Sequence, residues 1–321
     1  MQKFVIYQPT RILFGAEMKG EFVKACLPFG KKGMIVTGGS SMERLGYLDE
    51  VKAAFAEQGI ELIHFKGIEP NPVAQTINKA AKIGQEAAVD FILALGGGSV
   101  MDASKAIGGL IHAQEDDVWP YVLGEPKSRQ MKGAIPILTI PTTAATASEV
   151  TAYAVISNPE VNGKSVLGYE FFKPLVSWMN PAYTTSLGAR TTQDGAADIL
   201  SHVLENYILG GDNSPIADRY TEMVIHTVLE TLPKVLKDPE NLDLRADLLW
   251  ASDLALNGYQ LAGRNPSQFV LHSMEHAASG FHPELAHGRG LATLYPAYFH
   301  WLWEQDRARE RFAQLGRRIF D

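Results

Sequence analysis

Residues 91–105 read FILALGGGSVMDASK, an apolar run that passes through three glycines and a serine into a helix-like stretch. The apolar run predicts a buried β-strand, and the residues after it predict a helix. Glycine lets the backbone approach a ligand closely, and the N-terminus of a helix offers N–H groups and a positive dipole end, which together suit a diphosphate. Because a tight strand-to-helix turn alone also uses glycine, the turn by itself is a weak signal.

Strand-like and helix-like runs alternate on both sides of this turn, up to about residue 180. GMIVTG (33–38), ELIHF (61–65) and AIPILTIP (134–141) predict strands, whereas residues 47–59 and 73–87 predict helices. This alternation is typical of βαβ units, with a largely parallel sheet and right-handed crossovers. We therefore predict an α/β nucleotide-binding domain over residues 1–180.

The chain changes character after Asn180 and Pro181. Residues 190–210, 214–236 and 244–263 carry apolar side chains with the period of a helix. We predict an all-α domain over residues 181–321. Its final stretch, EQDRARERFAQLGRRIFD (304–321), predicts one charged amphipathic helix whose apolar face has no following partner.

Composition and charge restrict the possible partners. The chain has 321 residues and a formal net charge of −7, and its lysines and arginines are dispersed, so we expect neither nucleic acid nor an anionic membrane surface as a partner. No run of about 18 apolar residues occurs, and the N-terminus lacks the pattern of a signal peptide. The single cysteine, Cys26, lies among apolar neighbours and predicts a buried thiol. These features favour a cytoplasmic protein.

Nine histidines occur, and four of them lie in HSMEHAASGFHPELAH (272–287). Asp198 and His202 are spaced i, i+4 on a predicted helix, so they share one face. His272 and His276 repeat this spacing, and His287 precedes a glycine. One carboxylate and two or three imidazoles could converge on a divalent ion.

Other nearby residues have simpler interpretations. Asp194 is either the N-terminal cap of the helix that carries Asp198 or a competing ligand. His282 is expected in a loop, and His226 and His300 on helix surfaces. HSMEH differs from the HExxH zinc-protease motif, because its glutamate, Glu275, is at the fourth position.

Four ordered stretches carry a family resemblance: GGGSVMDASK (96–105), PTTAATASEVT (141–151), DILSHVLENY (198–207) and HSMEHAASGFHPELAHG (272–288). Together they resemble the iron-containing, or group III, alcohol dehydrogenases, which have the dehydroquinate-synthase-like fold. The resemblance spans nearly the whole chain. IEPNP (68–72) and LRADLLWASDLALNG (244–258) further resemble NADPH-dependent aldehyde reductases and butanol dehydrogenases.

The resemblance implies roles for particular residues. The metal ligands would be Asp198, His202, His272 and His287, and His276 would line the same site and help to move a proton. The residues implied for the nucleotide are Asn71, Gly97, Gly98, Ser99, Asp102, Thr142, Thr143 and Lys164, with the diphosphate on 97–99 and the threonines near the nicotinamide. Ser148 and Glu149 would have a structural role.

Two departures from the family pattern affect these expectations. The segment between the last two histidine ligands is one residue longer than usual, which leaves open whether His272 or His276 is the third ligand. The family also continues through further helices, so we expect a truncated C-terminus and an incomplete second domain.

The resemblance predicts a metal-dependent oxidoreductase that transfers a hydride between NAD(P)H and an aldehyde or primary alcohol, working as a homodimer. Three histidines and one aspartate suit Fe²⁺ or Zn²⁺. IVTGGSS (35–41) offers Gly38, Gly39, Ser40 and Ser41 where a carboxylate would bind the ribose hydroxyls of NAD(H), so we predict NADP(H), with NAD(H) as the alternative.

Aromatic residues such as Tyr153, Trp250 and Phe269 favour a medium-sized aldehyde over a sugar phosphate. The alternative functions are a glycerol-dehydrogenase or dehydroquinate-synthase type of enzyme on the same fold, and a truncated metal- or nucleotide-binding protein without turnover.

Overall fold

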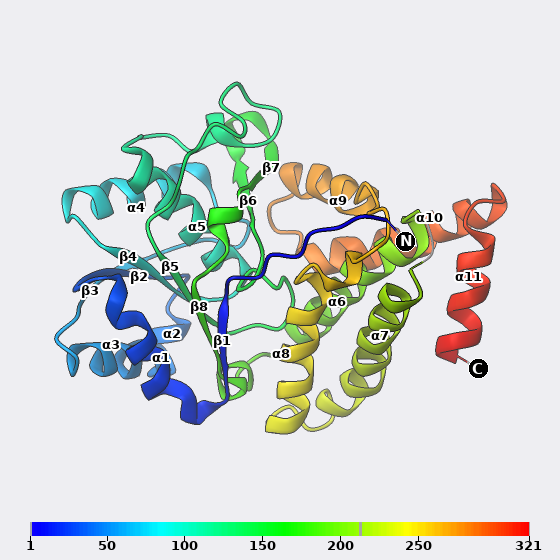
Figure 1. Cartoon of the computed structure of the whole chain (residues 1–321), viewed down its shortest axis with the longest axis horizontal. Helices are drawn as coiled ribbons and strands as arrows, with labels where there is room; N and C mark the ends of the chain where they lie inside the picture. The colour runs from blue at the N-terminus through cyan, green and yellow to red at the C-terminus, as the bar shows by residue number, and fades with distance from the viewer. Residues whose placement is uncertain (1, 212–213, 321) are drawn as a thin grey trace. The chain divides into compact units, whose positions relative to one another are not determined.

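The computed structural model describes residues 2–211 and 214–320 (Figure 1). These residues form two compact units. An α/β unit contains Pro9–Thr143 and Ser148–Thr184, and a helical unit contains the described residues outside those two ranges, including 2–8 and 144–147. Each unit has hydrophobic clusters of its own.

The α/β unit is built on one six-stranded sheet in which all neighbouring strands pair in parallel. Its spatial order is β1 (Arg11–Phe14), β8 (Val176–Met179), β5 (Ile137–Pro141), β4 (Phe91–Gly96), β2 (Lys32–Thr37) and β3 (Glu61–Lys66). From β2 the chain moves outward to β3, then returns to β4 on the other side of β2. The strand order therefore reverses between β2 and β4, and such a switch point is where ligands bind in open α/β sheets.

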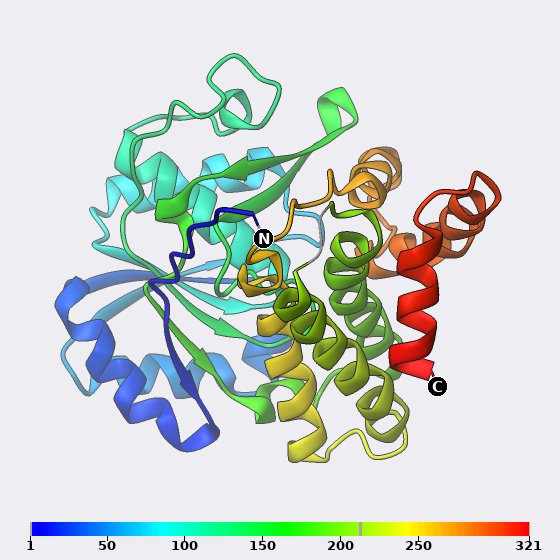
Figure 2. The same ribbon diagram turned by 45° about the vertical axis from the view of Figure 1, so that its right-hand side comes forward.

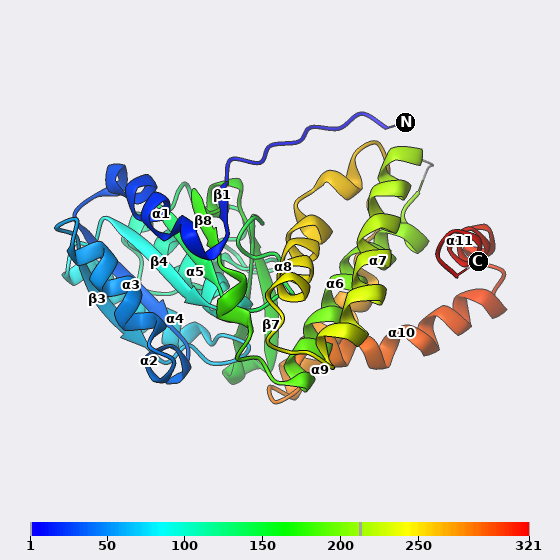
Figure 3. The ribbon, with the colours of Figure 1, turned by 90° about the horizontal axis from the view of Figure 1, so that it is seen from below.

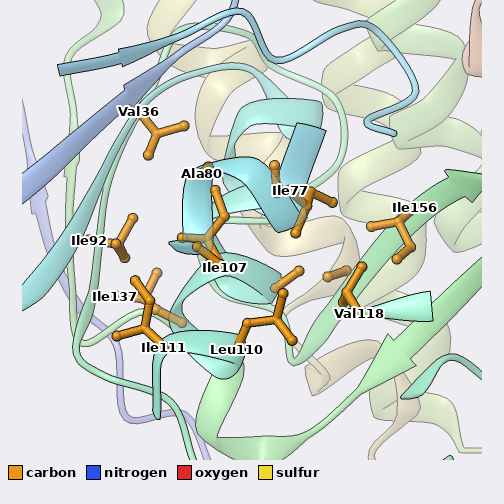
Figure 4. Packing of buried hydrophobic residues seen from close by; sticks show 14 of the residues in the cluster. Val36, Ile77, Ala80, Ile92, Ile107, Leu110, Ile111, Val118, Ile137 and Ile156 are labelled. Atoms are coloured by element: carbon orange, nitrogen blue, oxygen red, sulfur yellow. The ribbon is translucent and has the colours of Figure 1, made fainter. Parts of the chain in front are cut away.

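Helices cover both faces of this sheet (Figure 2). Met34 and Val36 of β2 pack in one hydrophobic cluster with α4 (Ala74–Glu86) and α5 (Gly98–Ala113), which Figure 4 shows from close by. Ile35, between them, packs in a second cluster with side chains of α1 (Lys19–Cys26) and α3 (Tyr47–Ala56). Because alternate residues of each strand are buried on opposite faces, the strands are continuously apolar in sequence.

The predicted alternation of strands and helices is confirmed, and several strands were missed. These are β1, β8, and the antiparallel pair β6 (Tyr153–Asn158) and β7 (Gly163–Gly168). Asn162 connects β6 to β7 with a left-handed backbone, at φ 47°. β1 and β8 have only four residues each, and β6 and β7 are partly polar, so these strands give a weak periodic signal.

The helical unit contains α6 (Ala189–Leu209), α7 (Pro215–Val235), α8 (Leu242–Leu256), α9 (Val270–Phe281), α10 (His287–Glu304) and α11 (Arg309–Leu315). Figure 3 shows α6, α7 and α8 packed against one another. Their shared core includes Ile199, Val228 and Leu248. The side chains of Ser214 and Asn241 cap α7 and α8 by accepting backbone N–H groups of the first turn.

The prediction of one continuous helix over 304–321 is wrong. Helix α10 ends at Glu304, α11 covers Arg309–Leu315, and a π-helical turn follows over Gly316–Phe320. Asp306 and Ala308 have φ values of 56° and 57°, a left-handed conformation that no α-helix continues through.

The apolar face of this stretch, which was expected to have no following partner, packs against earlier helices. Phe312 and Leu315 of α11 pack against the cluster of Tyr207, Ile208 and Leu302. Arg311 anchors the same helix by donating to the backbone oxygen of Tyr207 at 2.7 Å.

Two predictions about the chain as a whole can be compared with the structure. Cys26 is completely buried, as expected, and its burial raises the pKa of the thiol. Within residues 2–211 and 214–320, none of the helices has the length and apolar character that a membrane crossing requires.

Candidate functional site

The glycine-rich turn has the predicted strand–turn–helix form. Strand β4 ends at Gly96 and α5 begins at Gly98, with Gly97 at the N-cap position, where no side chain can cap the helix. A β-carbon on Gly97 would lie 2.9 Å from Oγ1 of Thr143. The amide of Thr142 donates to the carbonyl of Gly96 at 3.0 Å. The turn and the 142–143 segment therefore lie together, and the first N–H groups of α5 provide a cradle that a diphosphate fits.

The second glycine turn, 38–41, lies beside the first. It follows β2, and a β-carbon on Gly38 would lie 3.6 Å from a methyl group of Val100, in the first turn of α5. Both turns are at the carboxyl ends of adjacent strands, on either side of the switch point. A β-carbon on Gly39 would have no heavy atom within 4 Å, so this position is open.

The first carboxylate after β2 belongs to Glu43. Lys66, at the end of β3, forms an ion pair with it, and Nδ1 of His64 lies 3.9 Å from its other oxygen. The hydrogen bond from Lys66 holds the pKa of Glu43 below its ordinary value. This carboxylate is thus neutralised by a neighbouring lysine.

Two further residues implied for the nucleotide contact each other. Nζ of Lys164, on β7, donates to Oδ1 of Asn71 at 3.0 Å. Asn71 has a left-handed backbone, at φ 56°, which asparagine tolerates better than most residues.

Asp102 lies on α5, where it joins a buried polar network. Its carboxylate accepts from Oγ of Ser148 at 2.5 Å and from the amide of Val155 at 2.9 Å. Lys105 is completely buried one turn later, and its Nζ donates to Ser148 at 2.7 Å and to the carbonyl of Tyr153 at 2.7 Å. Burial raises the pKa of Asp102 and lowers that of Lys105 to about 8. The network links β6 to α5. Ser148 contacts both Asp102 and Lys105 in this network, which agrees with the structural role expected of it.

The histidine-rich segment and α6 meet inside the helical unit. Asp198 and His202 lie on α6, His272 on α9, and His287 is the first residue of α10. Oδ1 of Asp198 lies 3.6 Å from Nε2 of His202 and 3.6 Å from Nε2 of His287. The ring centroids of His202 and His272 are 5.1 Å apart, and those of His272 and His287 are 5.4 Å apart.

His272 and His276 occupy different positions in this cluster. Ligand atoms of Asp198, His202 and His272 all lie within 4.8 Å of one another, and all three residues are buried. His276 is half-buried, and its ring centroid is 6.5 Å from that of His272 and 5.2 Å from that of His287. The geometry therefore favours His272 as the third ligand and leaves His276 at the edge of the cluster.

The hydrogen bonds of His272 and His287 test whether these residues fit a metal ion. Nδ1 of His272 lies 2.7 Å from Oε2 of Glu205, and Nδ1 of His287 contacts Oε2 of Glu275. An ionised carboxylate only accepts hydrogen bonds, so each Nδ1 atom donates, and in a neutral ring the lone pair is then on Nε2. Nε2 of His287 lies 3.6 Å from Oδ1 of Asp198, and a cation between the two atoms would bind to both.

The distances and protonation states agree with this interpretation. Two ligand atoms of a tetrahedral Zn²⁺ ion, each about 2.0–2.1 Å from it, lie about 3.4 Å apart, close to the measured 3.6 Å. Burial lowers the pKa of His202 to about 4. Its imidazole is therefore neutral at pH 7, the form that binds a metal.

Glu205 and Glu275 were missed by the sequence analysis, although both are completely buried. Each follows a histidine of the cluster by three residues, Glu205 after His202 and Glu275 after His272. A carboxylate on the same helical face as a candidate ligand is the signal that could have identified them.

The remaining candidates lie outside the cluster. Asp194 is not a cap, because α6 begins at Ala189; its carboxylate accepts from Arg289 at 2.6 Å. His282 is exposed beside Glu284, and His300 is exposed beside Glu304. His226 is half-buried, with Nε2 3.0 Å from the carbonyl of Arg318, so its expected position on a helix surface is only partly right.

Comparisons with known proteins agree with this architecture. Residues 9–181 match the family model described as iron-containing alcohol dehydrogenase, and residues 192–321 match the model of the C-terminal part of the Fe-containing alcohol dehydrogenase family. The chain therefore belongs to the iron-containing alcohol dehydrogenase family.

Individual relatives cover the whole chain. It is 36% identical over 322 residues to the probable NADH-dependent butanol dehydrogenase 1 of Bacillus subtilis (strain 168), covering 100% of this chain and 81% of that protein. It is 35% identical over 323 residues to the NADPH-dependent aldehyde reductase YqhD of Escherichia coli (strain K12), with the same coverage. The crystal structure of an NADH-dependent butanol dehydrogenase A from Thermotoga maritima superimposes with a TM-score of 0.94 at 30% identity, covering 100% of this chain and 79% of that one.

Proposed function

We propose that the chain reduces aldehydes, or oxidises primary alcohols, with NAD(P)H and one divalent metal ion. Membership of the iron-containing alcohol dehydrogenase family supports this activity directly. The observation that carries the metal centre is the approach of two possible ligand atoms, Nε2 of His287 and Oδ1 of Asp198, to 3.6 Å of each other.

In this proposal Asp198, His202, His272 and His287 hold the ion in the helical domain, which we propose over residues 181–321. A divalent ion there supplies a Lewis acid for a carbonyl or alkoxide oxygen. The donor set suits Fe²⁺ and Zn²⁺. Membership of the iron-containing alcohol dehydrogenases favours Fe²⁺. His276, half-buried beside His287, is placed to hold or pass a proton at the edge of the cluster.

The α/β domain, which we propose over residues 1–180, binds the nucleotide. The turn at Gly97, Gly98 and Ser99 receives the diphosphate, and Thr142 and Thr143 border it. The pair of Lys164 and Asn71 offers an ammonium group and an amide to the same cofactor. Asp102, in the second turn of α5, stays a predicted contact of the nucleotide. Bound NAD(P)H supplies the hydride from its nicotinamide ring.

NADP(H) is the cofactor that the 38–41 turn favours. Gly38, Gly39, Ser40 and Ser41 place no carboxylate there, and Lys66 neutralises Glu43 nearby. NAD(H) is the alternative, because relatives of almost equal identity are named for either nucleotide.

The substrate that we propose is a medium-sized aldehyde. Phe269 lies edge-on to His272, with ring centroids 4.9 Å apart, and gives the metal cluster an apolar border that suits a medium-sized aldehyde. We further propose a cytoplasmic location, supported by the lone buried Cys26, and no nucleic-acid partner, supported by the net charge of −7. The homodimer that we also propose is what membership of the family implies.

The test follows NADPH and NADH oxidation with butanal by chelator-stripped protein, before and after adding Fe²⁺ or Zn²⁺. Activity restored by either ion supports the proposal and ranks the metals. His202→Ala should lose both bound metal and activity while it still binds NADPH, measured by nucleotide fluorescence. His300→Ala, an exposed histidine of α10, is the matched control. Full turnover of His202→Ala at normal metal content would contradict the ligand assignment.

A further inference from the structure

Each of two buried glutamates in the helical unit reaches a histidine on the next helix of the metal cluster. Glu205 of α6 accepts from Nδ1 of His272 on α9 at 2.7 Å. Glu275 of α9 accepts from Nδ1 of His287 on α10. Both glutamates are completely buried. The three helices are therefore linked in order by two carboxylate–imidazole contacts.

We infer that Glu205 and Glu275 are positioning residues, which set the tautomer and ring orientation of His272 and His287 so that both Nε2 atoms are directed at one divalent ion. This inference rests on the proposed metal centre. A ligating histidine that donates its other N–H to a carboxylate is held in one orientation and becomes a more basic ligand.

Both carboxylate oxygens of Glu205 accept hydrogen bonds from α9. Its second oxygen, Oε1, accepts the backbone N–H of Leu271 at 2.8 Å. Leu271 lies in the first turn of α9, a helix that begins after Phe269 and has no side-chain cap. Glu205 thus takes up an N–H group at the start of α9 as well as the ring of His272, and both of its oxygens are engaged away from the ion.

Gly290, three residues after His287, leaves space for the side chain of Glu275. A β-carbon on Gly290 would lie 2.8 Å from Cγ and 3.1 Å from Oε1 of Glu275, so glycine at this position leaves room for the carboxylate. Glu275, His276 and His287 could by themselves form a second metal group. However, Nδ1 of His287 contacts Oε2 of Glu275 directly, and this contact uses the Nδ1 atom while Nε2 of the same ring lies 3.6 Å from Asp198.

The test compares Glu205→Gln and Glu275→Gln with the unaltered chain after chelator stripping. Zn²⁺ affinity is measured by competition with a chromophoric chelator, and the geometry of the site by the visible spectrum of bound Co²⁺. Each variant is expected to lose about 10–100-fold in Zn²⁺ affinity and to change the Co²⁺ spectrum, because an uncharged amide oxygen accepts more weakly than a carboxylate and the NH₂ group replaces the second acceptor.

Glu222→Gln is the matched control. Glu222 is a buried carboxylate of α7 that accepts from Tyr207 at 2.8 Å and from Arg219 at 2.9 Å, away from the histidines. This variant is expected to keep both the Zn²⁺ affinity and the Co²⁺ spectrum even where it lowers the melting temperature. Equal losses of affinity in Glu222→Gln and Glu275→Gln would overturn the inference, because both would then reflect general destabilisation.

A measurement on the unaltered chain covers the case in which Glu205→Gln fails to fold. NMR of ¹⁵N-labelled histidine side chains in the metal-free protein reports which ring nitrogen carries the proton. We expect the Nδ1–H tautomer for His272 and His287, and finding Nε2–H at either would overturn the inference for that pair.

The outcomes separate this inference from the proposed function. An unaltered chain that binds neither Zn²⁺ nor Co²⁺ overturns the metal centre, and the inference falls with it. Tight binding that both glutamine variants retain overturns the inference alone. Two ions per chain, with one lost in Glu275→Gln, would make Glu275 a ligand and also overturn its positioning role.

Discussion

Gly288 of α10 lies directly against the backbone carbonyl of Asp194 in α6, and a β-carbon on it would be 1.9 Å from that oxygen. Asp194 is one turn before Asp198, and Gly288 follows His287. The absence of a side chain at residue 288 therefore lets α10 approach α6 closely enough to bring Nε2 of His287 within 3.6 Å of Asp198.

Gly288→Ala should therefore weaken metal binding without altering any ligand. The backbone of Asp194 belongs to a helix and cannot move aside, so α10 must shift, with a strain of about 1–3 kcal/mol. Taken entirely from metal binding, this corresponds to about 5–150-fold in affinity. Chelator competition with Zn²⁺ measures it. Gly20→Ala in α1, where a β-carbon meets no heavy atom within 4 Å, is the control and should leave Zn²⁺ affinity unchanged.

Gly39→Asp should shift nucleotide preference toward NADH. An added carboxylate repels a 2′-phosphate and accepts hydrogen bonds from ribose hydroxyls, so the Kd for NADPH should rise about tenfold or more while that for NADH is kept or falls. Titration of nucleotide fluorescence measures both constants. Gly39 is a cleaner site than Gly38, where a β-carbon would lie 3.2 Å from the carbonyl of Ile68. Gly39→Asn is the uncharged control, and equal effects of the two variants would refute the electrostatic argument.

Lys105→Met should destabilise the α/β unit. The substitution removes hydrogen bonds to Ser148, Thr151 and the carbonyl of Tyr153, and it leaves Asp102 without the ammonium group 3.8 Å away. Breaking a buried ion pair costs about 3–5 kcal/mol, so the urea midpoint should fall clearly. Adding Asp102→Asn to this variant should recover part of the loss, because no buried charge then remains.

The control for this prediction is Lys127→Met. Lys127 forms a half-exposed ion pair with Glu115 at 3.1 Å. Removing it should cost less than about 1 kcal/mol. A similar loss for Lys105→Met and Lys127→Met would show that the buried network is not important for stability.

Strong periodic patterns and motifs made most of the architecture predictable from sequence. The apolar strands β2, β4 and β5 are buried on both faces, and α6 to α8 carry an apolar stripe, so local sequence contains their signal. Partly polar strands such as β6 and β7 depend on pairing with each other, a contact that local periodicity does not report. The same is true of residues 2–8 and 144–147, which belong to the helical unit only through their contacts.

In the candidate site, too, local spacing could be read from the sequence, whereas long-range contacts could not. The i, i+4 spacing of Asp198 and His202 could be recognised in one helix, and the structure brings His272 and His287 to them. The partners of those histidines could not be predicted, because Glu205 and His272 are 67 residues apart in sequence. The break between α10 and α11 was missed since it depends on left-handed conformations at Asp306 and Ala308, residue types that do not require them.

Asp253 of α8 should make the stability of the helical unit depend on pH near neutrality. It is completely buried, and Oδ2 has no hydrogen-bond partner among the described residues. Burial raises its pKa to about 7, whereas an unfolded aspartate has a pKa of about 3.9. Between these values the folded chain holds a proton that the unfolded chain has lost. The contribution to stability is therefore fully present below pH 4 and disappears as the pH rises through 7, and its total is on the order of 4 kcal/mol.

Asp253→Asn removes this titration, since an amide stays neutral. Urea unfolding of both proteins at pH 5 and pH 8 measures the effect. The stability of the unaltered chain, relative to Asp253→Asn, should fall by more than about 1 kcal/mol between the two pH values. Asp247→Asn, at an exposed position of the same helix, should show no such change relative to the unaltered chain. Parallel pH profiles for the unaltered chain and Asp253→Asn would mean that Asp253 is ionised in the folded protein at pH 5.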